Sequence, residues 1–295
     1  MSAAARGWLL LCADLADGAR PLTSAQLREL RLHLRRSERR TDDPDRPLRV
    51  EDLRLAGLDE EGAARVLALL ERETALDAYL ESARIFGIRP LTLADPEYPA
   101  RLRRRLGPDA PPVLFCRGNL GLLSRPTVSL TGSRVLDEAS EAFAAAVGRL
   151  AAKEGKVLVS GNAVGADCAA QSACLQSGGA IVAVVPGELE NCVPKTDREL
   201  YLCQTGWHLP FTVWRALERN RLIYALSGHA LIARSGVRGG TFSGASDALA
   251  RGLCPVSVRD DGSAGSRALI ALGAARVQTL SSLDPPPAAQ LPLPD

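Results

Sequence analysis

The sequence predicts an α/β protein in which a parallel sheet has helices on both faces and is preceded by a small helical domain. After Pro126, short apolar segments of strand length alternate with amphipathic helical segments, which is the pattern of a covered parallel sheet. The first part of the chain shows helical periodicity alone. With 295 residues, 46% hydrophobic and 24% charged, the chain can build a substantial core, and this composition excludes disorder along most of its length.

We expect three regions: a helical domain over residues 1–92, a sheet domain over 93–280 and a Pro-rich tail over 281–295. In the first region Leu27, Leu30 and Leu34 share one helix face, and arginines cover most of the remainder. A second helical stretch runs from about residue 59 to 86. The basic face is typical of a solvated helix, and a nucleic-acid contact there is the weaker alternative because acidic residues follow it.

The sheet domain begins with a turn-rich joint, Asp95–Pro99, because each proline restricts the residue before it. A short apolar strand follows at Val113–Cys116. Further strands are expected at 127–131, 157–160, 181–185, 230–233 and 255–258. Helices are expected at 139–150, 166–176 and 243–251. No internal repeat is present.

Glycines gather where the predicted strands end, which is the edge at which open parallel sheets bind ligands. Glycine allows backbone N–H groups to approach an anion, and the start of the next helix adds partial positive charge. One such loop could be a plain turn, but several on one edge favour an anionic ligand. The motifs G-x-G-x-x-G and G-x-x-x-x-G-K-[ST] are absent, so a dinucleotide is not indicated. The loops are 132–134, 160–167, 186–187 and 235–244.

Aromatic and basic residues alternate between Trp207 and Arg221. Rings interleaved with arginines can stack on bases and hold phosphates. Rings in such a segment are more often core anchors, so both interpretations stay open for Trp207 and Trp214. Asp167, at the start of a predicted helix, is expected to accept backbone N–H groups rather than to act as a catalytic base. His229 is expected to be a structural histidine.

The net charge and the cysteine content limit the classes of ligand and site that the sequence supports. The formal net charge is only +2, so overall charge gives no strong indication of nucleic-acid binding. The seven cysteines form no C-x-x-C pair, which favours reduced thiols in a cytoplasmic protein over disulfides or a zinc site. We expect no metal and no cofactor. The apolar run Trp8–Cys12 is expected to lie in a buried helix rather than in a lipoprotein signal, and no segment is long enough to span a membrane.

Taken together and in order, the motifs resemble those of the DNA-processing protein A (DprA, also called Smf) family over roughly residues 95–277. The resemblance rests on Asp95–Pro99 with Pro111–Phe115, on Gly132–Arg134, on Ser160–Asp167, on Arg219–Ser227, and on Ser235-Gly236 with Thr241.

This resemblance implies an extended Rossmann-like domain that binds single-stranded DNA and is not an enzyme. It also implies a role in natural transformation, in which the protein loads a RecA-type recombinase onto the strand, and it implies a homodimer. It implies that Arg134, Arg219 and Arg221 hold phosphates while small and polar residues shape the rim. The implied DNA-binding residues are Gly132, Ser133, Arg134, Ser160, Gly161, Asn162, Gly165, Arg219, Asn220, Arg221, Ser235, Gly236, Gly240, Thr241 and Ser243.

Several positions depart from the family pattern. Val164 and Glu218 stand where family members usually carry arginine. The N-terminal helices show no evident helix-hairpin-helix glycine turn, and the chain ends in Pro-rich residues where many members have a winged-helix-like domain. These departures predict weaker DNA binding or a changed ligand.

The main alternative is a nucleotide-binding or nucleotide-hydrolysing protein of the related lysine-decarboxylase-like (LOG) group. That group carries a Gly-Gly-x-Gly-Thr loop followed by a catalytic Glu, whereas no Glu follows Gly239–Thr241 before Asp247. No G-x-S-x-G elbow is present either, so catalysis is not expected. A third possibility is an interaction protein with a degenerate site.

Overall fold

The computed structural model describes residues 1–36, 49–55, 57–204 and 206–285. These residues form two compact units. The first contains Met1–Cys116 with Gly187–Asn191 and Cys203–Pro210, and the second contains Arg117–Pro186, Cys192–Leu202 and the chain from Phe211 onward. The sequence-based boundary between residues 92 and 93 thus falls inside the first unit.

The first unit begins with helices, as the sequence predicts. They are α1 (Ala3–Cys12), α2 (Ser24–Arg36), α3 (Val50–Leu55), α4 (Glu60–Leu70) and α5 (Glu73–Ile85). Leu11, Leu30, Leu53 and Leu69 belong to the hydrophobic cluster that holds these helices together. Leu27 is also buried, whereas the side chain of Leu34 lies outside the described part.

The connection between α3 and α4 contains a glycine turn that the sequence did not reveal. Gly57 has a φ of +94°, a value that favours glycine. Asp59 then caps α4, because its Oδ1 accepts the backbone N–H of Gly62 at 2.8 Å. The first unit also holds an antiparallel strand pair, the helix α6 (Ala100–Leu106) and two short 3₁₀ helices. The pair is β1 (Arg89–Thr92) with β2 (Val113–Gly118), and the 3₁₀ helices are η1 (Gly107–Asp109) and η3 (Leu189–Asn191).

The second unit contains a parallel sheet with the strand order β6-β5-β4-β3-β7-β8-β9. The strands are β3 (Thr127–Thr131), β4 (Val157–Ser160), β5 (Ala180–Val184), β6 (Glu199–Cys203), β7 (Ala230–Ile232), β8 (Val256–Arg259) and β9 (Ala275–Val277). The chain enters the sheet through the 3₁₀ helix η2 (Leu120–Ser124). β3 is central, pairing with β4 on one side and β7 on the other, so the loops after these three strands lie close together.

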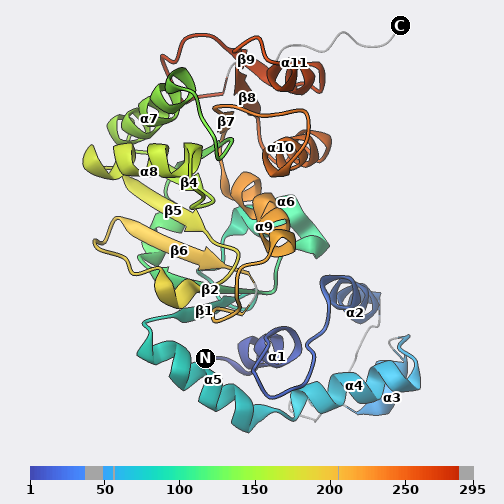
Figure 1. Cartoon of the computed structure of the whole chain (residues 1–295). Helices are drawn as coiled ribbons and strands as arrows, with labels where there is room; N and C mark the ends of the chain where they lie inside the picture. Colours follow the sequence, from blue (N-terminus) through green and yellow to red (C-terminus); the bar gives the residue numbers. More distant parts are fainter. Residues whose placement is uncertain (37–48, 56, 205, 286–295) are drawn as a thin grey trace, which may run out of the picture. The chain divides into compact units, whose positions relative to one another are not determined.

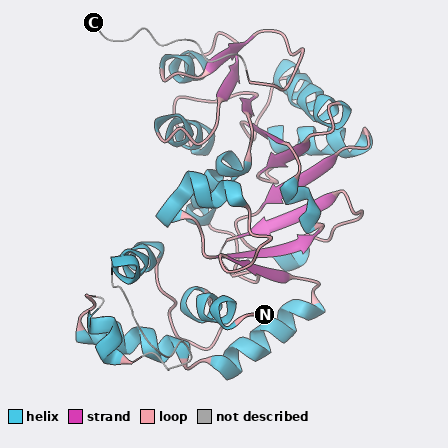
Figure 2. Ribbon diagram, turned by 180° about the vertical axis from the view of Figure 1, so that it is seen from behind, coloured by secondary structure: helices cyan, strands magenta, loops and turns pink. Residues whose placement is uncertain are grey.

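Helices cover both faces of this sheet, which confirms the predicted fold class. α7 (Glu138–Lys153) and α8 (Ala166–Gln176) pack against each other on one face. α9 (Val213–Leu226), α10 (Gly240–Ala250) and α11 (Ala264–Ala271) lie on the other (Figure 1). Figure 2 shows the same layers from behind, with the magenta strands between cyan helices.

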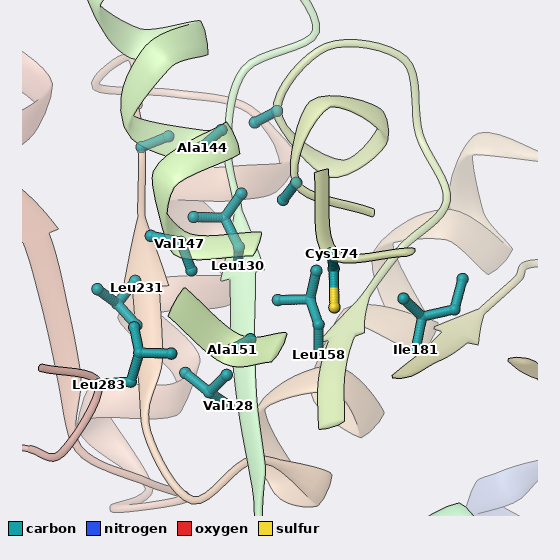
Figure 3. Packing of buried hydrophobic residues seen from close by; sticks show 13 residues of the cluster. Val128, Leu130, Ala144, Val147, Ala151, Leu158, Cys174, Ile181, Leu231 and Leu283 are labelled. Atoms are coloured by element: carbon teal, nitrogen blue, oxygen red, sulfur yellow. The ribbon is translucent and has the colours of Figure 1, made fainter. Parts of the chain in front are cut away.

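The main core lies between the sheet and the α7–α8 layer. Figure 3 shows Val128, Leu130 and Leu158 of the strands beneath Ala144 and Val147 of α7. These strand residues are fully buried. Apolar residues on successive strand positions therefore mark a sheet buried on both faces, as expected from the sequence.

The first residues of the predicted tail are part of this core. Leu283 is 1% exposed and lies beside Leu231 and Val128 (Figure 3). Its N–H donates to Glu154 Oε1 at 3.0 Å, and its carbonyl oxygen lies 3.0 Å from Nδ1 of His229. Nε2 of His229 lies 2.7 Å from the Ser257 hydroxyl, so both ring nitrogens have partners and the histidine is structural, as predicted. The rest of the predicted tail, 286–295, lies outside the described residues.

Some elements were not predicted. The sequence interpretation treated residues between the third and fourth predicted strands as one long connection, yet they contain β6 and α9. β6 includes Glu199, which is 4% exposed and accepts N–H groups from Lys195 and Thr196 at 3.1 and 3.0 Å. A buried charged residue of this kind interrupts the apolar pattern on which strand prediction depends. Within the described part of the chain, no helix is both long and apolar enough to cross a bilayer.

Candidate functional site

A pocket of about 380 Å³ opens at the ends of the central strands of the second unit. Loops after β3, β4 and β7 form its walls together with α9 and the start of α10. Nine of the predicted binding residues line it, so the structure brings these nine together in one pocket. These nine are Gly132, Ser133, Arg134, Arg219, Asn220, Ser235, Gly236, Gly240 and Thr241.

Arg219 is the most unusual residue of this pocket. Its side chain belongs to α9 and is only 6% exposed, yet its Nε and Nη1 have no hydrogen-bond partner among the described residues. Burial lowers the pKa of the guanidinium, and the charge of Asp167 opposes that shift. A buried polar atom without a partner is costly and rare in native proteins. The described part of the chain thus supplies no acceptor for these two nitrogens.

Asp167 lies in the first turn of α8 and also lines the pocket. Its Oδ2 accepts the backbone N–H of Gly161 at 2.9 Å and that of Ala163 at 3.3 Å. The carboxylate therefore shapes the loop before its own helix, in line with the predicted role as an acceptor of N–H groups. Burial raises the pKa of Asp167 to about 6, while the nearby Arg219 charge and the two N–H groups limit the rise.

Two glycines permit the close packing of this loop. An ideal Cβ at Gly161 would overlap the Arg219 guanidinium, lying 2.5 Å from Nη2 and closer to Cζ and Nη1. Gly165 has a φ of +86°, and a Cβ there would lie 2.5 Å from the carbonyl oxygen of Ser133. Gly161 thus leaves the space that the buried arginine fills, although neither glycine lines the pocket itself.

Side-chain hydrogen bonds join the remaining walls. The Thr241 hydroxyl donates to the carbonyl oxygen of Gly132 at 3.0 Å. The Asn220 amide donates to the carbonyl oxygen of Gly240 at 3.2 Å. These bonds tie the loop after β3 and helix α9 to the start of α10.

Helix α10 begins at the pocket without a side-chain cap. Its N-cap residue is Gly239, with a φ of +100° and no capping hydrogen bond. The first N–H groups of a helix have no partner within it and attract anions. Gly239, Gly240 and Thr241 line the pocket, so this helix start faces the same space as Arg219.

The other predicted site residues lie elsewhere. Ser160 is fully buried, and its hydroxyl accepts the Gln171 amide at 2.5 Å. Arg221 does not line the pocket, and its Nε donates to Asp247 at 3.1 Å. Asn162, with a φ of +55°, and Ser243 are exposed and also lie outside the lining.

An exposed apolar rim borders the pocket at the start of α9. Val213 and Leu217 line the pocket and remain largely exposed, and Trp214 between them is 67% exposed. The structure separates the two tryptophans that the sequence treated alike. Trp207 is 5% exposed and packs against Tyr79 with ring centroids 5.7 Å apart, so it is a core anchor.

The described residues contain no group of three or more His, Cys, Asp and Glu side chains placed to hold a metal ion. The chemistry of the pocket comes instead from guanidinium groups, backbone N–H groups and hydroxyls. This donor set suits an anion that carries several acceptor oxygens.

Comparison with known families supports the resemblance read from the motifs. Residues 89–283 match the family described as DNA recombination-mediator protein A. A DNA processing protein DprA of Streptococcus pneumoniae is 33% identical over 179 residues, which cover 56% of this chain and 63% of that relative. A second DNA processing protein DprA, from Bacillus subtilis, is 26% identical over 213 residues, covering 68% of this chain and 71% of the relative. The chain therefore spans less than two thirds of the pneumococcal protein.

Solved structures give the same assignment. The X-ray structure of DNA processing protein A from S. pneumoniae superposes with a TM-score of 0.69 and 26% identity, covering 87% of this chain and 90% of that one. The DNA processing protein A of Helicobacter pylori, solved to study its single-stranded DNA binding mode, has a TM-score of 0.56 and 26% identity. The latter match covers 66% of this chain and 93% of the other.

Proposed function

Because the chain belongs to the DNA recombination-mediator protein A family, we propose that it binds single-stranded DNA at the glycine-rich edge of its parallel sheet. The observation that carries this proposal is Arg219, whose buried Nε and Nη1 lack partners at the wall of the pocket. A phosphate oxygen supplies the acceptors that these donors need. Burial strengthens such a charge-assisted hydrogen bond because water does not compete for it.

A second cation stands near the first. Arg134 is exposed, lines the pocket and is close enough to Arg219 that its charge lowers the pKa of that residue. Two cations held near each other repel unless an anion lies between them. We assign Arg134 to attracting the backbone and Arg219 to fixing one phosphate. The Nε of Arg221 donates to Asp247, which makes Arg221 a weaker phosphate ligand than Arg134 and Arg219.

The exposed rim on α9 extends the proposed DNA path beyond the pocket. Trp214 presents a large ring to solvent next to the pocket residues Val213 and Leu217. Base stacking on an aromatic ring tolerates any sequence, since every base has a flat face. We propose that a base next to the anchored phosphate stacks on Trp214.

The proposal extends to the cellular role. The chain would act in the cytoplasm as a homodimer, take part in DNA processing during recombination and transformation, and deliver the strand to a RecA-type recombinase. It would do so by binding alone, without catalysis. Family membership is the support for each of these points, and each can be tested once DNA binding is measured.

Fluorescence anisotropy of a labelled single-stranded oligonucleotide, titrated with protein at several salt concentrations, tests the central claim. Each phosphate contact to a single strand contributes about −0.7 to the slope of log K against log salt. Arg134→Ala should weaken binding uniformly across sequences and reduce the slope by about that amount. Arg149→Ala, which removes an exposed arginine of α7 outside the pocket, is the matched control.

Duplex DNA and AMP serve as competitors in the same assay. Poor competition by both, with a slope equivalent to several contacts, supports single-strand binding. Absence of oligonucleotide binding would refute the proposal. Ready displacement by AMP would instead favour the nucleotide-binding alternative.

A further inference from the structure

The pocket has more donors than an internal DNA phosphate can satisfy. Arg219 lines it, and the buried Nε and Nη1 of this residue have no partner among the described residues. The start of α10, which has no side-chain cap, contributes Gly239, Gly240 and Thr241 to the lining. A phosphodiester within a strand has two free oxygens, and its other two oxygens carry sugars. A terminal phosphate has three free oxygens and one sugar. The number of buried donors therefore fits the terminal group better.

The charge of the pocket points the same way. Arg134, Arg219 and Arg238 line it together with Asp167, which gives a formal net charge of two positive. A phosphodiester carries one negative charge, whereas a phosphate monoester carries about −1.5 to −2 at pH 7. A monoester thus neutralises the pocket, and an internal phosphate leaves one cation unmatched.

Access to Arg219 is a third constraint. The residue is 6% exposed and lies against Gly161, so a ligand must enter the pocket to reach it. An internal phosphate would have to bring a nucleotide on each side into a pocket of about 380 Å³, near the small end of the range for small-molecule sites. A strand end or a free nucleotide needs to bring only one nucleotide into the pocket.

We propose that this pocket recognises a phosphate monoester, supplied by the phosphorylated end of a DNA strand or by a free nucleotide, in preference to an internal phosphodiester. That the monoester belongs to a DNA strand rests on the proposed function. In this arrangement Arg219 and the start of α10 bind the terminal phosphate, Arg134 and Arg238 contact it from the mouth, and the following bases leave along the rim at Trp214.

Direct anisotropy titrations with internally labelled oligonucleotides test this preference. The set differs only at the ends: a 5′-hydroxyl strand, a 5′-phosphorylated strand, a 3′-phosphorylated strand, and a 5′-hydroxyl strand longer by two nucleotides. The longer strand adds two diester charges and so controls for charge alone. One of the phosphorylated strands is expected to bind about tenfold tighter than both hydroxyl strands. Displacement of the labelled strand by dAMP identifies a free nucleotide as a ligand of the pocket. Displacement by inorganic phosphate identifies the phosphate group as the part that is recognised.

Variants then locate the preference. Arg219→Gln should abolish it, and Arg238→Ala should reduce it, while Arg149→Ala should leave it unchanged. Equal binding of all four strands, with no displacement by dAMP, would overturn the inference while leaving single-strand binding intact. Binding of dAMP without binding of the hydroxyl strands would refute the proposed function and keep the inference. No binding by any probe, measured for dAMP by calorimetry, would refute both.

Discussion

Substituting Gly161 by alanine tests whether the buried guanidinium is held where the structure places it. An ideal Cβ at this position would lie 2.5 Å from Nη2 of Arg219 and closer to Cζ and Nη1. Gly161 is not among the glycines with positive φ, so the effect of the added methyl comes from the clash and not from backbone strain. The guanidinium must move, and with it the two unpartnered donors.

The size of the effect follows from the contacts that are displaced. Losing a hydrogen bond to a charged group costs about 1.5–3 kcal/mol, which corresponds to about 10- to 150-fold weaker DNA binding. Overpacking a buried site typically lowers the free energy of unfolding by about 1–3 kcal/mol. Anisotropy with a single-stranded oligonucleotide measures the first effect, and urea unfolding measures the second.

Gly7→Ala is the matched control, because no atom lies within 4 Å of a Cβ at that position of α1. A double-mutant cycle with Arg219→Ala gives the sharpest result. If Gly161 acts through Arg219, the double variant binds DNA as weakly as Arg219→Ala alone. Fully additive losses, or wild-type affinity in Gly161→Ala, would refute the reasoning.

Three further predictions concern other parts of the second unit. Trp214→Ala should weaken single-strand binding by about 1–3 kcal/mol if one base stacks there. The slope of log K against log salt should stay unchanged, because no charge is removed. A changed slope together with wild-type affinity would contradict this prediction. Leu283→Ala should lower the free energy of unfolding by about 2–5 kcal/mol, whereas Leu272→Ala, at an exposed position, should have little effect; equal effects in urea unfolding would show that Leu283 is not packed. Asp167, whose pKa burial raises to about 6, gains a proton as the pH falls from 7.5 to 5.5 and no longer offsets the charge of Arg219. DNA affinity at constant ionic strength should therefore rise on acidification in the wild type but not in Asp167→Asn, and a rise of equal size in both would assign it to another group.

The sequence predicted the sheet well where its strands are buried on both faces. Segments such as residues 127–131 and 157–160 are short and apolar, and the structure has strands at those positions. Prediction failed where side chains satisfy polar groups inside the fold. β6 contains buried Glu199, and α9 carries charged residues on several sides, including buried Arg219. Neither segment has the apolar periodicity by which elements are recognised.

The same limit applies within the site. Arg219 and Arg221 are two positions apart and look alike in the sequence, yet one is buried at the pocket and the other pairs with Asp247. Residues two apart on a helix point in different directions, and only the packing of α9 decides which of them faces the sheet. Trp207 and Trp214 likewise differ only in their packing, because Trp207 contacts Tyr79, whereas Trp214 lies in the first turn of α9 and is 67% exposed. Motif order led to the residues that line the pocket, whereas only burial distinguishes one arginine or tryptophan from the other.

The burial of Arg219 links stability to binding. Desolvating a guanidinium while leaving Nε and Nη1 unpartnered costs free energy in the unliganded fold, and a single carboxylate, Asp167, offsets only part of it. An anion that completes the hydrogen bonds removes that cost, so it binds the folded state alone and stabilises it by mass action. Under the proposed function, the cost of burying Arg219 is regained when the anion binds, so this burial contributes to affinity rather than to the stability of the free fold.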